Sequence, residues 1–201
     1  MIGSEYRRFV VVISGPSGAG KSSFVKALLR GNGGDLVYSV SATTRAKRAH
    51  EADAKDYFFL TRDEFQRRVE AGDFVEHAQV HGEMYGTLRS QIEQVLDSGR
   101  NVLLDVDVQG GQAVRGVYPD AVLIFVLPPS IEDLEERLRA RGTDREDRIK
   151  VRLENAQREI ALMREYDYAV VNDDLETATR KVLAIVEAER CRASRRVDVR
   201  R

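Results

Sequence analysis

The chain of 201 residues has room for one α/β domain with small inserted segments, and it is too short for two domains with separate cores. Its composition, 42% hydrophobic and 32% charged, excludes a disordered chain. The formal net charge of −1 argues against a global attraction to nucleic acid, no apolar run is long enough for a membrane helix, and the single cysteine cannot form an internal disulfide. We therefore expect a cytoplasmic protein, a monomer or a homodimer, with no nucleic-acid or membrane partner.

The first pattern along the chain is a strand, a glycine-rich loop and a helix. The apolar run at 9–13 is typical of a strand that is covered on both faces, and apolar residues at helical spacing follow Lys21 until the glycines of 31–34. A second strand is expected at 36–40, and the polar stretch at 41–55 predicts a loop.

Residues 57–98 have the pattern of a small insert with secondary structure of its own. The expected elements are a strand at 57–60, a helix from the capping box 61–64 through Val69, a strand at 74–80 and a helix at 88–96. Because the flanking segments have the strand and helix pattern of the first unit, we expect the insert to lie apart from the main sheet.

Strands and helices alternate again after residue 100. Strands are expected at 101–106, 121–127 and 168–171, and helices from Ser130 to near Gly142, along a stripe from Ile149 to Met163, and at 175–185. This alternation predicts right-handed crossovers in a mostly parallel sheet. The basic tail 190–201 holds six arginines; we expect a frayed, solvated, disordered terminus, with contact to RNA or acidic lipid as the weaker alternative.

The strongest motif lies between the first strand and the first helix. Two glycines five residues apart, followed by a lysine and a hydroxyl residue, match the phosphate-binding loop: Gly15, Pro16, Ser17, Gly18, Ala19, Gly20, Lys21 and Ser22. In such a loop, backbone N–H groups converge on phosphate oxygens, the lysine reaches the β- and γ-phosphates, and the hydroxyl can ligate Mg²⁺. The motif predicts that the phosphates of a nucleoside triphosphate bind here with magnesium.

The phosphate-binding loop alone leaves GTPase, ATPase and kinase activities open. A guanine-switch GTPase would read its base with an Asn-Lys-x-Asp motif, and the segment 172–174 lacks the lysine. Asp105 ends a buried strand, where a metal-organising carboxylate is expected, and Asp107 is predicted on the same strand face two residues on. His77 and His81 are too few and wrongly spaced on a strand for zinc.

Several further segments, taken with the loop, resemble the guanylate kinase family. They are Gly15 to Ser23, Ser39 to Arg45, Lys55 to Phe59, Tyr85 to Thr87, Asp105 to Gly110 and Val171 to Asp174. The resemblance runs in order from about Phe9 to about Ala188, and the block from Ser39 to Arg45 is more diagnostic than the loop. The resemblance implies phosphoryl transfer from MgATP to GMP, giving ADP and GDP.

The resemblance also implies roles for individual residues. Those that would bind GMP are Ser41, Arg45, Arg48, Tyr57, Glu76, Tyr85, Thr87 and Asp107, of which Arg45, Arg48, Tyr57 and Tyr85 hold the phosphate. Glu76 would accept hydrogen bonds from the guanine N–H donors, and the hydroxyls of Ser41 and Thr87 would lie near guanine O6. Lid arginines Arg137, Arg141 and Arg152 would join Lys21, Arg45 and Asp105 in catalysis, with Arg139, Arg145 and Arg148 as alternatives in the same segment.

Two further expectations concern ATP and magnesium, and one segment departs from the family pattern. Asn172 would contact adenine, and Ser22 with Asp105 would hold magnesium, directly or through water. In the loop after Arg45, Lys47 and Ala49-His50 replace the usual prolines and glycine, which leaves the aim of Arg48 open.

The expected fold is that of an α/β phosphate-loop NTPase with a mostly parallel sheet, a small nucleoside-monophosphate-binding insert and a lid. The core comprises residues 1–40, 100–136 and 155–189, the insert 41–99 and the lid 137–154. Two alternatives remain: a guanylate-kinase-like module that binds a protein without catalysis, and a related kinase acting on a phosphorylated sugar. The first would not need the phosphate-binding loop, and the second would not need Glu76 with Ser41 and Thr87.

Overall fold

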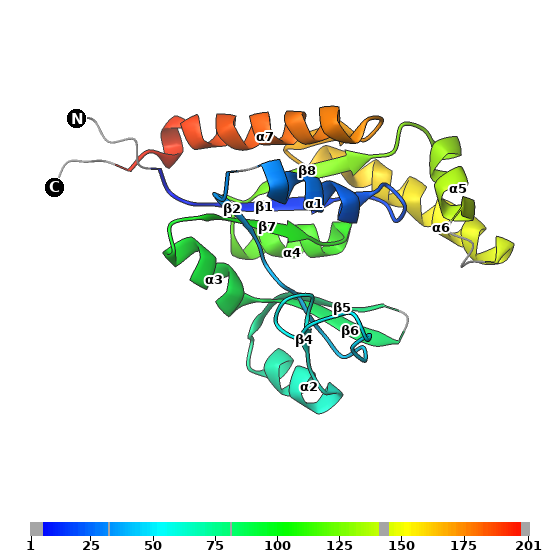
Figure 1. Cartoon of the computed structure of the whole chain (residues 1–201), viewed down its shortest axis with the longest axis horizontal. Coiled ribbons are helices and arrows are strands. Elements are labelled where there is room, and N and C mark those ends of the chain that lie inside the picture. Colours follow the sequence, from blue (N-terminus) through cyan, green and yellow to red (C-terminus); the bar gives the residue numbers. More distant parts are fainter. Residues whose placement is uncertain (1–5, 32, 81, 141–144, 198–201) are drawn as a thin grey trace.

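A computed structural model describes residues 6–31, 33–80, 82–140 and 145–197, and it contains two sheets (Figure 1). The larger sheet is parallel, with the strand order β2-β7-β1-β8-β9. Its strands are β1 (Val10–Ser14), β2 (Leu36–Tyr38), β7 (Asn101–Asp105), β8 (Val122–Leu127) and β9 (Tyr168–Val171). These strands confirm the α/β class and the mostly parallel sheet expected from the sequence.

Helices cover both faces of the parallel sheet. On one face lie α1 (Lys21–Gly31) and α7 (Leu175–Cys191), and on the other α3 (Arg89–Asp97) and α4 (Val108–Val117), as Figure 1 shows. Every residue of β1 is buried, and alternate side chains enter the two cores: Val11 and Ile13 one, Val10 and Val12 the other. This explains why the strand reads as an unbroken apolar run.

The insert forms the second sheet, in the order β4-β3-β6-β5. Its elements are β3 (Ala42–Thr43), β4 (Phe58–Phe59), α2 (Arg62–Glu70), β5 (Phe74–Val80) and β6 (Glu83–Leu88). The side chain of Thr61 accepts a hydrogen bond from the Glu64 N–H and caps α2, as the sequence predicts. The expected loop at 41–55 is wrong at its start, since β3 lies there, and β6 was not anticipated.

Three helical segments complete the chain between β8 and β9. They are α5 (Ile131–Ala140), α6 (Glu146–Ala161) and the short 3₁₀ helix η1 (Leu162–Glu165). Helices α5 and α6 each run across an expected lid boundary. Residues 141–144 between them, including Arg141 and Gly142, lie outside the described ranges. Across the ranges that are described, no helix is both long and apolar enough to cross a membrane.

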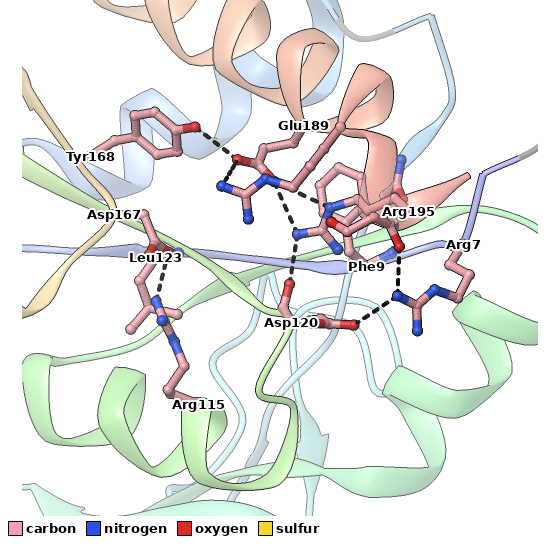
Figure 2. Close-up of polar contacts among 12 residues, drawn as sticks. Arg7, Phe9, Arg115, Asp120, Leu123, Asp167, Tyr168, Glu189 and Arg195 are labelled. Carbon is pink, nitrogen blue, oxygen red and sulfur yellow. Dashed lines mark hydrogen bonds and ion pairs between the residues drawn. The ribbon is translucent and has the colours of Figure 1, made fainter. Parts of the chain in front are cut away.

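The expectation of a disordered tail is wrong for residues 190–197, which have defined structure, whereas residues 198–201 lie outside the described ranges. Helix α7 continues to Cys191, the 3₁₀ helix η2 (Ala193–Arg195) follows, and Arg196 bridges to Tyr6. Arg195 and Glu189 are both buried, and Figure 2 shows the contact between them that holds this segment in place. The arginine-rich composition of the tail suggested solvation, but the tertiary structure gives Arg195 a buried carboxylate.

Candidate active site

The phosphate-binding loop joins β1 to α1 at the carboxyl edge of the parallel sheet. Its backbone takes left-handed angles, with φ of 100° at Gly18 and 89° at Gly20, which side chains larger than glycine rarely adopt. A Cβ atom at Gly20 would also lie 2.7 Å from the side-chain nitrogen of Asn172. The glycines of the motif are therefore required both by the backbone angles and by the space around the loop.

Lys21 and Asp105 come together because β1 and β7 are neighbours. The register pairs Ile13 with Asp105, so the carboxylate lies at the strand end beside the loop. Burial raises the pKa of Asp105, and the charge of Lys21 partly offsets that rise. The Lys21 ammonium donates to the backbone carbonyls of Gly15 at 2.6 Å and Pro16 at 3.3 Å.

Ser22 lies on the first turn of α1. It lines a small cavity of about 170 Å³ over the loop, together with Ser17, Gly18, Gly20, Lys21 and Ser23. Backbone N–H groups at a helix start favour anions, so this cavity suits phosphate oxygens.

A second cavity of about 230 Å³ lies between the core and the insert. Seven of the predicted site residues line it: Lys21, Ser41, Tyr57, Glu76, Tyr85, Asp105 and Asp107. They come from segments that are up to 86 positions apart in the sequence, from Lys21 to Asp107. One correction concerns Asp107: β7 ends at Asp105, and Asp107 instead caps α4 by accepting from the Gly110 N–H at 2.7 Å.

On the insert side of this cavity, Glu76 and Thr87 form a close pair. They are register partners on β5 and β6, and the Thr87 hydroxyl donates to Glu76 Oε1 at 2.5 Å. Burial raises the pKa of Glu76, the hydrogen bond from Thr87 opposes the rise, and the charge of Asp107 adds to it. Thr87 is thus placed to orient the carboxylate.

The predicted phosphate-binding residues separate into two groups. Arg45 lies with the tyrosines: its guanidinium carbon is 5.4 Å from the centre of the Tyr57 ring, and the Tyr57 and Tyr85 rings meet edge to face at 6.0 Å. Arg48 lies in the exposed part of the loop, where its backbone N–H donates to Glu51.

A third cavity, of about 450 Å³, opens on the other side of the phosphate-binding loop. Arg137 and Asn172 line it together with Gly18 and Gly20. The Asn172 amide donates to the Ala19 carbonyl at 2.8 Å, so its side-chain nitrogen supports the loop. Of the other predicted lid arginines, Arg152 lies on α6, and Arg141 falls outside the described residues.

Two residues that the sequence analysis did not single out belong to this region. Tyr38 lines the cavity between core and insert, where burial raises its pKa, and Glu51 pairs with Arg45. Tyr38 could have been found from the sequence, because it is the last residue of β2 and ligands bind at the carboxyl ends of parallel strands. Glu51 had no such signal within a polar loop.

Comparison with known proteins gives the family. The family model described as "Guanylate kinase" matches residues 7–189. The chain belongs to the guanylate kinase family. The guanylate kinase of Thermotoga maritima is 52% identical over 187 residues, which are 93% of this chain and 90% of that protein. The guanylate kinase of Clostridium perfringens is 46% identical over 194 residues, 96% of this chain and 89% of that protein.

A solved structure agrees with the sequence comparison. The crystal structure of guanylate kinase from Anaplasma phagocytophilum matches with a TM-score of 0.78 and 35% identity, covering 98% of this chain and 93% of that chain. The expected guanylate kinase family and fold are therefore confirmed. The non-catalytic module and the sugar-phosphate kinase are not favoured by these relatives.

Proposed function

We propose that this guanylate kinase transfers the γ-phosphoryl group of ATP to GMP, giving ADP and GDP. The observation that carries the proposal is the cavity between core and insert, which joins Lys21 and Asp105 on one side to Glu76 on the other. Such a cavity brings an acceptor nucleotide next to the phosphate-binding loop. The family supports the same reaction.

The chemistry requires positioning and positive charge more than a base. The attacking atom is a phosphate oxygen, which is already ionised at neutral pH because the second pKa of a phosphomonoester is about 6. The remaining task is to hold two anions in line and to spread the charge of the transferring group. Lys21 and Arg45 are the cations that we assign to the donor and the acceptor phosphates.

Arg137, which lines the cavity beside the loop, is the described lid arginine that is best placed for the ATP phosphates. We assign the same cavity, of about 450 Å³, to the ATP base, with Asn172 at its wall. Closure of α5 and α6 over the phosphates would exclude water and limit hydrolysis.

Magnesium is the cofactor that we propose, because the donor set fits it. Mg²⁺ takes oxygen ligands and keeps several waters, with one or two side chains and the substrate phosphates completing its shell. Ser22 and Asp105 supply a hydroxyl and a carboxylate at the loop, and the described residues contain no cluster of three or more His, Cys, Asp or Glu that would make an all-protein site. Bound magnesium would neutralise charge on the β- and γ-phosphates.

Guanine selectivity follows from hydrogen-bond matching. Guanine has N–H donors at N1 and N2, and an ionised Glu76 can accept a hydrogen bond from each. Adenine instead has an acceptor at N1 and no amine at C2. A buried carboxylate facing adenine would stay unpaired, and sites of this kind reject such analogues by about 10⁴-fold. The Thr87 hydroxyl holds Glu76 in the required orientation.

ADP release measured with MgATP and one acceptor at a time tests the proposal. We expect turnover with GMP and little with AMP, CMP, UMP or a sugar phosphate. Equal rates with all acceptors would refute the guanine assignment, and a preference for the sugar phosphate would identify the related kinase. Tight GMP binding without ADP release would indicate the non-catalytic module.

A further inference from the structure

Carboxylates tether the loop between β3 and β4 to itself and to β4. Asp56 accepts from the Ala52 N–H at 2.8 Å, and Asp53 accepts from the Phe59 N–H at 3.0 Å. Glu51 does more, because its two oxygens bind different partners. One accepts from Arg45 Nη2 at 2.7 Å, and the other from the backbone N–H of Arg48 at 2.9 Å.

Glu51 fixes one side of the Arg45 guanidinium, and other groups fix the rest. Arg45 Nη1 donates to the Ala46 carbonyl at 2.8 Å, and the guanidinium carbon lies 5.4 Å from the centre of the Tyr57 ring. Tyr57 and Tyr85 themselves line the cavity assigned to GMP. The side chain of Arg45 therefore stands beside the cavity in one defined orientation.

The pair is sheltered although the loop around it is exposed. The side chains of Arg45 and Glu51 are 19% and 8% exposed, whereas residues 46–50 between them are exposed. The hydrogen bond from Arg45 and that from the Arg48 N–H lower the pKa of Glu51 to about 2, so its carboxylate is ionised at neutral pH. Residues 46–50 contain no proline, so no ring restricts the backbone conformation of this segment.

We propose that Glu51 is a positioning residue that holds Arg45 ready for the phosphate of the acceptor nucleotide and ties down the loop through the Arg48 N–H. The inference rests on the proposed function. A flexible arginine loses conformational freedom when it binds a ligand, and a partner that orders it beforehand removes that loss. A carboxylate near a phosphate site also repels the ligand, so the direction of the change in KM on removing Glu51 decides between positioning and competition.

The test compares Glu51→Ala and Glu51→Gln with the wild type in the GMP-dependent assay. We expect Glu51→Ala to raise KM for GMP by about tenfold, because the free-energy cost of immobilising one flexible side chain would then be taken from GMP binding. KM for ATP should stay unchanged. Glu51→Gln, which keeps an acceptor for Arg45, should show a smaller rise. Glu64→Ala is the matched control: Glu64 pairs with Arg67 and Arg68 on α2 of the same insert, and its loss should leave both KM values unchanged.

A double-mutant cycle with Arg45→Ala separates positioning from a general structural effect. Glu51→Ala should add less than about twofold to KM for GMP when Arg45 is already absent. An equal rise in both backgrounds, a fall in KM, or an unchanged KM in both Glu51 variants would overturn the inference. A wild type that shows no preference for GMP would instead refute the proposed function, so the two failures are distinguishable.

Discussion

The buried ion pair between Glu189 and Arg195 gives the sharpest stability prediction. The two side chains are 3% and 5% exposed, and Arg195 donates to Glu189 Oε2 through Nε at 3.2 Å and Nη2 at 3.0 Å (Figure 2). The Tyr168 hydroxyl donates to the other carboxylate oxygen at 2.7 Å. Glu189→Ala would therefore leave a buried guanidinium without its countercharge and a hydroxyl without its acceptor.

The expected cost follows from that geometry. Breaking one partner of a buried ion pair typically costs about 3–5 kcal/mol of unfolding free energy. Arg195 retains a hydrogen bond to the Asp120 carbonyl at 2.8 Å and a stacking contact 4.3 Å from the Phe9 ring centre, so we expect the lower part of that range. For a chain of this length, about 3 kcal/mol corresponds to a fall in Tm of roughly 6–12 °C.

Urea and thermal unfolding measure the effect. The matched control is Glu187→Ala, on the same helix, where the side chain is 65% exposed in its pair with Arg190, and we expect a change within about 0.5 kcal/mol. Replacing both Glu189 and Arg195 by Met should recover much of the loss, because the uncompensated charge is removed as well. Equal stability of Glu189→Ala and Glu187→Ala would refute the reasoning.

The pair should matter for stability and not for turnover. Arg195 contacts Phe9 and Asp120, which precede β1 and β8, at the edge of the sheet opposite the phosphate-binding loop. Well below Tm, Glu189→Ala should therefore retain wild-type kcat. A selective loss of kcat with an intact fold would contradict this separation.

Three further predictions concern the site. Lys21→Ala should abolish turnover while circular dichroism and Tm stay near the wild type, and retained turnover would exclude the assigned role. Glu76→Gln should lose the preference for GMP over AMP; since burial raises the pKa of Glu76, the wild-type KM for GMP should also rise as pH falls, and a flat pH profile would contradict the role of the ionised carboxylate. Asp105→Asn should stabilise the ligand-free protein at pH 7 although it removes activity. The folded state holds the Asp105 proton more tightly than the unfolded state, so stability falls as pH rises above its ordinary pKa of 3.8, and asparagine avoids that loss. Asp97→Asn, at the exposed end of α3, is the control, and equal unfolding curves for the two variants would refute the argument.

The sequence by itself determined the units whose signals are local. The apolar run before a glycine-rich turn predicted β1 and the phosphate-binding loop, and the capping residues Thr61 and Ser130 predicted the starts of α2 and α5. The strands at 74–80 and 168–171 have the predicted bounds. Such signals depend on period and on capping chemistry, which are properties of neighbouring residues.

Tertiary structure alone decided the features that depend on distant partners. Helix α4 was not anticipated because Gly110 and Gly111 are poor helix formers; the fold needs glycine at position 111, where a Cβ would lie 2.6 Å from the Tyr166 hydroxyl. Arg195 is buried because it forms an ion pair with Glu189 and stacks on the ring of Phe9. At these positions the environment of a residue is set by side chains that are distant in the sequence. Local composition does not indicate which side chains those are.

The candidate site divides in the same way. Motifs gave the residue types, and the sheet order brought Lys21 next to Asp105. The pairs that orient the site, Thr87 with Glu76 and Glu51 with Arg45, were visible only in the structure. A hydrogen bond between two side chains forms or fails on a difference of a few tenths of an ångström in the donor–acceptor distance. The fold fixes that distance, and the spacing of residues along the chain does not.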